Sequence, residues 1–340
     1  MATVIKSIGT GPSRDYSTLA AALADYPNIA ENGDTLIFEH YGDSVFADDV
    51  DGLFDAWADD PDWTTGELIV AAATGETVVI DRTDVDGSYL SVFACTTGNT
   101  LTFRVRDLEF INLGGGTGGL PVLSFSCAGN ATHAYVERVK FTAADVCPNP
   151  DAVQSAIQSC YGSIEAHACI FDGRGHLGTH HQTCFFLSNY GVHRVGHCVI
   201  AGVNKGIHTY RGAVEVVNIV FVNVNIPRLI DSGQGSITGS NNGSTGVLDW
   251  CESVDLIDPT NEFVSYALES GNNDYRLKAA ALLVDAGASA ETFPWLTATD
   301  FLGRPWIDPR DIGAYRYADP PTQGPVGVLR GPLNLLNRRL

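Results

Sequence analysis

The residues best suited to chemistry gather in one stretch near the middle of the chain: Glu165, His167, Asp172, Arg174, His176, His180 and His181. A pair of carboxyl groups can supply the acid and the base that cleave a glycosidic bond. Closely spaced histidines can bind a metal ion. The plainer interpretation, which we favour, is a glycine-rich surface loop at 172–181 with solvated histidines. We therefore assign no catalytic residue, metal or cofactor, and keep Glu165, Asp172, His176 and His180 as the alternative catalytic set.

Two further groups of residues give weaker signals. Aspartates between residues 48 and 60 could hold calcium, but the spacing of an EF-hand is absent. A solvated acidic loop is therefore expected at Asp48, Asp49, Asp51, Asp59 and Asp60. Several tryptophans could stack on sugar rings, although packing within loops and caps is the interpretation that we favour for Trp57, Trp63, Trp295 and Trp306.

The C-terminal residues 326–340 are apolar and basic, on a chain whose net charge is −20. They follow a Pro/Gly-rich linker at 319–325, and no acidic residue occurs after Asp319. Apolar residues in such number indicate docking, either onto the chain's own body or onto a partner. We favour a partner protein with acidic groups, bound through Leu329, Arg330, Leu333, Leu335, Leu336, Arg338, Arg339 and Leu340.

An internal repeat predicts the scaffold that positions these residues. The pattern Val105-x-x-Leu108-x-Phe110 returns in four later stretches, which end at Phe141, Phe171, Ile200 and Phe221. The end residues are 31, 30, 29 and 21 positions apart. Each unit is interpreted as a strand because its apolar residues alternate, and most units are followed by a second short apolar run. Units this short, without helices, favour a right-handed parallel β-helix over a propeller.

The ends of the chain differ from this repeat. Ser17 is expected to cap a short helix that carries Leu19 and Ala22 and closes the open end of the solenoid. A strand is predicted at 34–40 and a Gly/Ser/Asn loop at 232–246. The predicted divisions are an N-terminal strand and capping helix at 1–33, a β-helix body at 34–318, and a linker with the extended docking tail at 319–340.

Composition excludes several functional classes. With 40 acidic and 20 basic residues, the chain is a poor binder of nucleic acid. No stretch approaches the ~18 consecutive apolar residues of a membrane helix. The eight cysteines form no zinc-ligand pattern and are expected to be reduced and buried. The first residues do not form a signal peptide, so synthesis in the cytoplasm is expected.

Both ends of the body resemble a known superfamily. The opening Ile8-Gly9-Thr10-Gly11, followed by Arg14-Asp15-Tyr16-Ser17-Thr18-Leu19, resembles the start of pectate-lyase-like right-handed parallel β-helix proteins, including many encoded by phages. Residues 275–317 resemble the closing segment of these proteins, with Tyr275-Arg276-Leu277, Val284-Asp285-Ala286-Gly287, Asp300-Phe301-Leu302-Gly303-Arg304-Pro305 and Asp311-Ile312-Gly313-Ala314-Tyr315. We interpret this closing motif as structural: its glycines permit turns, Asp300 and Asp311 bind backbone N–H groups, and Arg304 pairs with one of those carboxylates.

The resemblance and the tail together predict a bacteriophage virion structural protein, such as a capsid decoration protein, a head fibre or a spike. It would lie on the virion surface and bind other capsid or tail proteins through its C-terminal tail. Binding of host surface polysaccharide and assembly as a homotrimer stay open, and neither a nucleic acid nor a membrane partner is expected. The alternative is a polysaccharide depolymerase or lyase with a site near Asp172 and His176.

Overall fold

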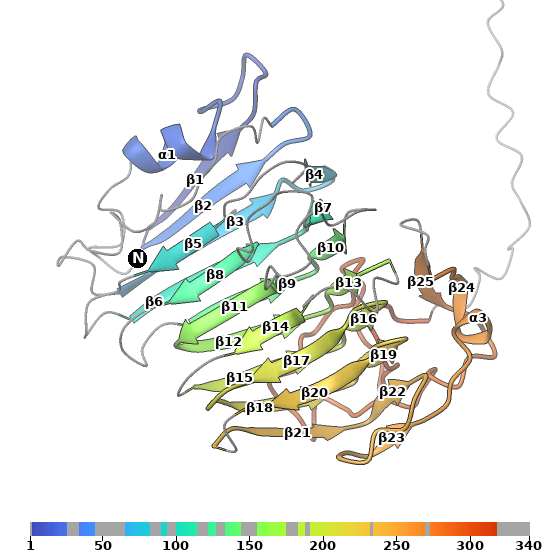
Figure 1. Ribbon diagram of the computed structural model, residues 1–340. Helices are drawn as coiled ribbons and strands as arrows, with labels where there is room; N and C mark the ends of the chain where they lie inside the picture. The colour runs from blue at the N-terminus through green and yellow to red at the C-terminus, as the bar shows by residue number, and fades with distance from the viewer. Residues whose placement is uncertain are drawn as a thin grey trace, which may run out of the picture.

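The computed structural model describes most of the chain as a stack of β-strand coils (Figure 1). The described residues are 2–25, 34–44, 65–81, 90–93, 100–113, 122–126, 133–143, 155–174, 183–187, 191–231, 234–268 and 273–317. Within them, nearly every regular element is a strand, and the strands form three long parallel sheets. The tail at 319–340 and the acidic stretch at 48–60 lie outside the described residues.

Sheet A has nine strands in the order of the chain. They are β1 (Thr3–Ile8), β2 (Thr35–His40), β3 (Thr65–Ala72), β6 (Thr100–Arg106), β9 (His133–Glu137), β12 (Ser163–His167), β15 (Val192–Gly196), β18 (Ala213–Val217) and β21 (Ser236–Ser240). The predicted early strand at 34–40 is therefore confirmed as β2.

Sheets B and C complete each coil. Sheet B contains β4 (Val78–Asp81), β7 (Leu108–Leu113), β10 (Lys140–Ala143), β13 (Ile170–Asp172), β16 (Val199–Ala201), β19 (Val220–Val222), β22 (Asn242–Ser244) and β23 (Ser253–Val254). Sheet C contains β5 (Leu90–Phe93), β8 (Leu123–Ser126), β11 (Ser155–Tyr161), β14 (Thr183–Leu187), β17 (Lys205–Thr209) and β20 (Ile226–Ile230). From β3 to β20 the chain passes through A, B and C in constant order, which confirms the predicted parallel β-helix. Its right-handed sense is the one that parallel crossovers adopt.

The pairing register reproduces the sequence repeat. Phe141 pairs with Phe110 on one side and Phe171 on the other, and the series continues through Ile200 to Phe221. The prediction that each unit is a single strand is wrong, because the unit crosses a corner from sheet A to sheet B. The residue at the corner has a positive φ in every coil of the repeat: Asp107, Arg138, Ala168, His197 and Asn218, followed by Asn241 in the next coil. One left-handed residue turns the chain sharply while both neighbouring strands keep their inward faces.

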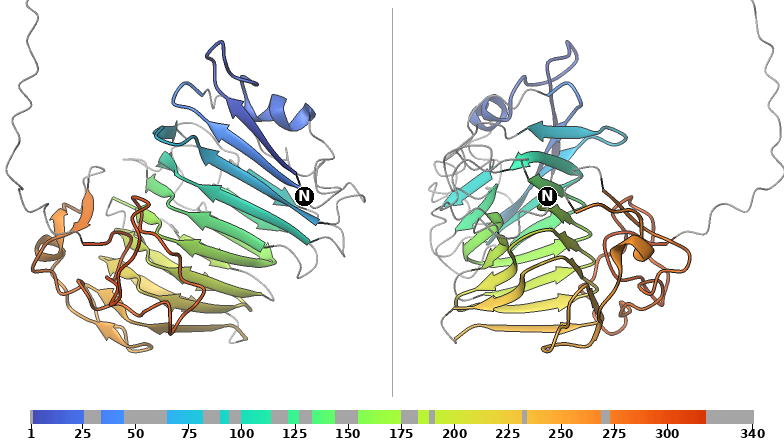
Figure 2. Two further views of the ribbon diagram at one scale, coloured as in Figure 1. Left: turned by 180° about the vertical axis from the view of Figure 1, so that it is seen from behind. Right: turned by 45° about the vertical axis from the view of Figure 1, so that its right-hand side comes forward.

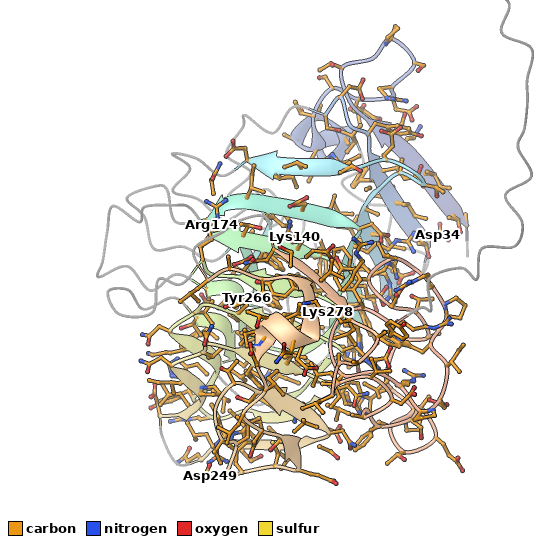
Figure 3. All side chains as sticks on the ribbon, turned by 90° about the vertical axis from the view of Figure 1, so that its right-hand side faces the viewer. Asp34, Lys140, Arg174, Asp249, Tyr266 and Lys278 are labelled. Carbon is orange, nitrogen blue, oxygen red and sulfur yellow. The ribbon has the colours of Figure 1, made fainter. Side chains whose placement is uncertain are left out.

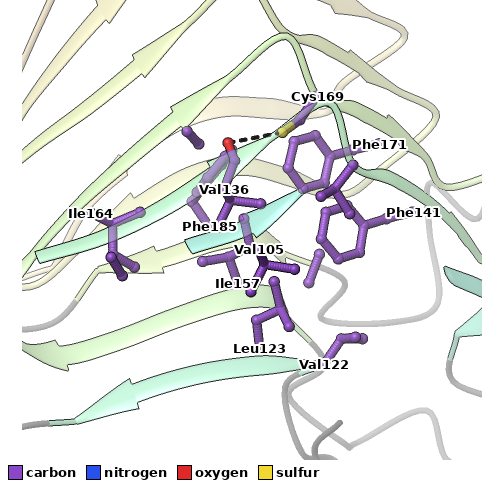
Figure 4. Packing of buried hydrophobic residues seen from close by; sticks show 14 of the residues in the cluster. Val105, Val122, Leu123, Val136, Phe141, Ile157, Ile164, Cys169, Phe171 and Phe185 are labelled. Atoms are coloured by element: carbon purple, nitrogen blue, oxygen red, sulfur yellow. Dashed lines mark hydrogen bonds between the residues drawn. The ribbon is translucent and has the colours of Figure 1, made fainter. Parts of the chain in front are cut away.

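The core is a column of apolar side chains inside the three sheets. The rings of Phe110 and Phe141 stack at 5.4 Å, and those of Phe141 and Phe171 at 4.9 Å. Figure 4 shows Phe141 and Phe171 beside Phe185 of sheet C, with the Cys169 thiol donating to the backbone oxygen of Val136 at 3.4 Å. Because the same position is filled in successive coils, each coil buries its apolar face against the next.

Different elements close the two ends of the solenoid. Helix α1 (Leu19–Asp25) places Leu19 and Ala22 in the core, as predicted for the N-terminal cap. Its first turn is capped by Thr18 rather than Ser17, since the Thr18 hydroxyl accepts from the backbone N–H of Ala21 at 3.2 Å. At the other end, Leu248 joins the same core. The predicted loop at 232–246 is wrong, because β21 and β22 fall within it and extend sheets A and B.

The segment after β23 lies against the outside of the solenoid (Figure 2). It contains α3 (Pro259–Glu262), β24 (Phe263–Ser265) and β25 (Asp274–Leu277), and β24 pairs antiparallel with β25. A second apolar cluster joins it to the outer face of sheet B through Ile170, Val199, Val220, Phe263, Tyr275, Leu283 and Ile312. The stretch 275–317 therefore covers a side of the solenoid, while Leu248 and its neighbours close the end.

Candidate functional site

Glu165 lies on the outer face of sheet A, near the end of β12. Arg194 of the next coil donates from Nη1 to Glu165 Oε1 at 2.8 Å, and His167 Nε2 lies 3.6 Å from Oε2. Burial raises the pKa of the Glu165 carboxyl, but hydrogen bonds from His167 and Arg194 outweigh it, and the pKa falls below its ordinary value. Glu165 is therefore an ionised, engaged carboxylate, which is unsuited to donate a proton.

Glu165 belongs to a ladder of side chains that runs across neighbouring coils. In register with it stand Tyr135 and Arg194, and Arg194 in turn pairs with Glu215 at 3.7 Å. Arg104 lies over the Tyr135 ring at 4.4 Å and extends the series. Exposed ion pairs contribute about 0–1 kcal/mol each, so the ladder fixes side-chain positions more than it stabilises the fold.

Asp172 occupies a different face, at the end of β13 in sheet B. Its side chain is 3% exposed and accepts from Asn273 Nδ2 at 3.0 Å and from the backbone N–H of Arg174 at 3.1 Å. Burial raises the pKa of Asp172, and hydrogen bonds from Arg174, Asn273 and Tyr275 oppose that rise in part. Asp172 thus joins sheet B to the segment around β25, on the side of the molecule that carries Arg174 and Tyr266 in Figure 3.

The alternative catalytic set is only partly visible in the described residues. Glu165 and Asp172 belong to different sheets, on either side of the corner at Ala168, where φ is 51°. Both side chains point outward, so they face different sides of the solenoid. His176 and His180 lie outside the described residues, as does His181. The described part of the cluster does not place its two carboxylates across one substrate position.

A polar column that the sequence analysis missed runs along the corner between sheets A and B. Several of these corner residues hold the C-terminal segment through their side chains. Arg138 Nη1 donates to Thr299 Oγ1 at 3.4 Å, and Asn241 Nδ2 donates to the backbone oxygen of Ala286 at 3.1 Å. Asn218 exchanges two hydrogen bonds with the backbone of Ala288, at 2.7 and 3.0 Å. The sequence does contain one signal for this column. The position two residues after Val105, Val136 and their equivalents is often Asn or Asp.

The closing motif acts as predicted. Asp300 is fully buried and accepts from the backbone N–H of Arg304 at 2.7 Å and from its Nε at 2.7 Å. Asp311 accepts from the backbone N–H of Asp285 at 2.8 Å. Gly303 and Gly313 have φ values of 74° and 109°, which a side chain would strain. These residues shape the segment that lies on the solenoid.

Two of the tryptophans singled out in the sequence, Trp295 and Trp306, pack against histidines. Trp306 stacks on His197 at 4.1 Å, and Trp295 lies 5.6 Å from the His167 ring. Packing, the interpretation favoured from the sequence, is therefore confirmed for these two residues. Trp57 and Trp63 lie outside the described residues, together with the aspartates at 48–60 and all the predicted docking residues of the tail.

Three further observations concern the described residues alone. No group of three or more His, Cys, Asp and Glu side chains among them could hold a metal ion. Cys169, Cys184 and Cys198 are buried free thiols, as expected, whereas the free thiol of Cys251 is only partly buried. No helix in this part of the chain is both long enough and apolar enough to cross a membrane.

Comparison with known proteins gives no assignment. No protein-family model matches the chain, and no curated protein is similar to it at a significant level.

Proposed function

We propose that this chain is a structural protein of a bacteriophage virion, such as a capsid decoration protein, a head fibre or a spike. The observation that supports a structural rather than a catalytic role is that both candidate carboxylates are hydrogen-bonded to other residues of the fold. Glu165 is bound into the charge ladder of sheet A, and Asp172 joins sheet B to the C-terminal segment. Both groups use their hydrogen-bonding capacity within the fold.

The architecture supports a rigid projecting body. Six turns of the solenoid, from β3 to β20, repeat the same three-sheet coil around one apolar column. Stacked coils of this kind resist bending because each sheet runs the length of the stack. The resemblance of both ends to phage-encoded β-helix proteins supports a place on the virion surface.

The sequence of the tail supports attachment through residues 326–340. Its arginines and leucines contrast with an acidic chain, and they suit an acidic, partly apolar surface on another capsid or tail protein. Host surface polysaccharide is a further ligand proposed for the exposed body. Homotrimer formation is compatible with this role and is measured directly by light scattering.

Incorporation into particles tests the proposal. Leu335→Asp with Leu336→Asp places two charges in the tail, and Leu302→Asp, at a residue 55% exposed on the body, is the matched control. Each form is expressed in the cell that encodes the protein. After lysis, the particles are separated on a density gradient. We expect the wild type and the control to sediment with particles and the tail variant to remain free. Equal incorporation of all three forms would refute docking by the tail, and absence of the wild type from particles would refute the virion role.

A second candidate function, cleavage of a polysaccharide, is favoured by one observation. The raised pKa of Asp172 is a property of carboxyl groups that act as general acids. Release of reducing ends or unsaturated uronates from capsular polysaccharide measures it. Loss of that release in Asp172→Asn, with retention in Asp308→Asn at an exposed carboxylate, would overturn the structural proposal.

A further inference from the structure

Residues 288–310, here called the lid segment, run beside the corner between sheets A and B: the stretch from Ala288 to Leu296 covers the outer face of sheet A, and Phe301 joins the apolar cluster on sheet B. Phe293, Trp295 and Leu296 of this segment pack against Val217 of β18. The lid segment also lies very close to Gly196 of β15, where an added Cβ would be 2.6 Å from Leu296 Cδ2 and 3.0 Å from Trp295. Figure 2 shows the red part of the chain running across the strands on this side. Because Gly196 has no side chain, Leu296 and Trp295 can approach the strand this closely. The surface of sheet A therefore fits the lid segment at this point.

His197 is the polar centre beneath the lid segment. It occupies the corner position of its coil with φ 52°, and its side chain is 0% exposed. The ring stacks on Trp306 at 4.1 Å. Its Nε2 atom lies 3.3 Å from Asn218 Nδ2 and 3.3 Å from Arg310 Nη1. Two elements distant in sequence thus meet at one imidazole nitrogen.

The partners of His197 determine its protonation state. Asn218 accepts from the backbone N–H of Ala288 at 2.7 Å and donates to its oxygen at 3.0 Å, which fixes the orientation of the amide. Its Nδ2 therefore faces His197 as a donor. The guanidinium of Arg310 can only donate. Two donors converge on Nε2, so this nitrogen must present a lone pair and the closed lid requires a neutral imidazole.

The charges around His197 reinforce this requirement. Burial lowers the pKa of His197 well below its usual range, and the charges of Arg310 and His167 lower it further, whereas hydrogen bonds to the backbones of Gly313 and Asp311 oppose this fall only in part. The negative groups nearby are already engaged. Asp308 pairs with Arg310 at 3.3 Å, and Glu165 pairs with His167 at 3.6 Å. Asp311 binds the backbone N–H of Asp285. The Trp306 ring would favour a cation above it, but it cannot replace the lone pair that both donors need.

We propose that the lid segment is released by acid. Protonation of His197 at Nε2 breaks its contacts with Asn218 and Arg310, and residues 288–310 then leave sheet A. Release uncovers Val217 and the part of the charge ladder formed by His167 and Arg194. This inference does not depend on the proposed virion role.

Linkage gives the size of the effect. In the open state His197 regains an ordinary histidine pKa near 6.5, whereas the closed state excludes the proton. The contribution of His197 to closure is therefore complete above about pH 6.5 and is lost as the pH falls below it. The equilibrium constant for opening should rise about thirtyfold between pH 7.5 and pH 5.

Hydrogen exchange of the full chain, read by mass spectrometry on peptides from 288–310, tests the proposal. Rates are divided by the intrinsic exchange rate at each pH, and peptides from β15 to β19 serve as the internal reference. His197→Asn removes the titration and suits the corner, since Asn218 and Asn241 hold the same position with positive φ. We expect the thirtyfold rise in the wild type and in His167→Gln, and no rise in His197→Asn. A rise retained in His197→Asn, or lost in His167→Gln, refutes the assignment.

A second variant opens the lid without touching the titrating group. Gly196→Ala inserts a methyl group against Leu296 and Trp295, and Gly246→Ala is the control because its Cβ would meet nothing closer than 3.9 Å. Gly196→Ala should raise lid exchange at every pH and leave the pH dependence unchanged, while the control matches the wild type. If Gly196→Ala leaves lid exchange at the wild-type level, residues 288–310 do not form a detachable lid.

Discussion

Asp300→Asn is the sharpest test of the structural role assigned to the closing motif. The Asp300 carboxylate accepts five hydrogen bonds from three residues: three from Arg304, one from the backbone N–H of Leu302 at 3.0 Å and one from the backbone N–H of Arg316 at 3.1 Å. The substitution keeps the shape of the side chain but turns one oxygen into a donor. That donor must face either the guanidinium or the backbone groups, all of which donate.

The expected cost follows from burial. Breaking a buried ion pair by removing one partner costs about 3–5 kcal/mol. Asp300 is 0% exposed, but the Arg304 side chain is 32% exposed, so water can solvate the cation that remains. We therefore expect a loss of about 3 kcal/mol in the free energy of unfolding, at the low end of that range.

Asp274→Asn provides the matched control. Asp274, like Asp300, binds an arginine close by in the sequence: Arg276 Nε lies 2.9 and 3.0 Å from its two oxygens. The Arg276 side chain, however, is 56% exposed. Exposed pairs of this kind contribute about 0–1 kcal/mol. Urea unfolding followed by circular dichroism measures both variants. Equal losses in the two would show that burial of Asp300 does not set its contribution. Adding Arg304→Met to Asp300→Asn should recover part of the loss, because the half-buried guanidinium that has lost its carboxylate is then removed as well.

Three further variants test the core, a buried histidine and the N-terminal turn. Phe141→Ala should lose about 3–5 kcal/mol of unfolding free energy in urea, and Phe186→Ala, on the outer face of sheet C, much less. His40 is buried with its pKa lowered to about 3, so its contribution is complete above about pH 6.5 and is lost as the pH falls. The stability of His40→Gln should therefore fall about 2 kcal/mol less than that of the wild type between pH 7.5 and pH 5. Gly9→Ala places a Cβ 2.3 Å from Asp43 Oδ1 and should cost about 1–3 kcal/mol, with Asp43→Ala relieving that cost in a double-mutant cycle by thermal unfolding.

The β-helix could be predicted from the sequence because its coils repeat the same inward residues. Phe110, Phe141 and Phe171 occupy equivalent positions, and their spacing equals the pairing register. The corner could not be predicted from alternation. The residues on either side of it, such as Val105 and Leu108, are both buried, so the pattern through Asp107 continues as if one strand were present. Only the positive φ of Asp107 separates β6 from β7.

The candidate site was predicted less well because sequence proximity does not indicate the face on which a side chain lies. Glu165 and Asp172 are seven positions apart, yet the corner at Ala168 directs them to different sheets. The contacts that position the C-terminal segment join residues such as Asn218 and Ala288, which are 70 positions apart. No local pattern marks such a pair. A coil corner in the left-handed conformation does leave one trace, because Asn and Asp tolerate it best.

That trace also explains why His197 is informative. Among the corner residues, Asn218 and Asn241 use their amides to bind backbone oxygens of the lid segment and of the residues just before it. His197 at the equivalent position instead contacts the guanidinium of Arg310. An amide there could accept from Arg310 at any pH, but an imidazole can do so only while it is neutral. The histidine therefore adds dependence on pH to a contact that an uncharged residue could make, and this difference between neighbouring coils is the basis for expecting the lid, rather than the solenoid, to respond first to acid.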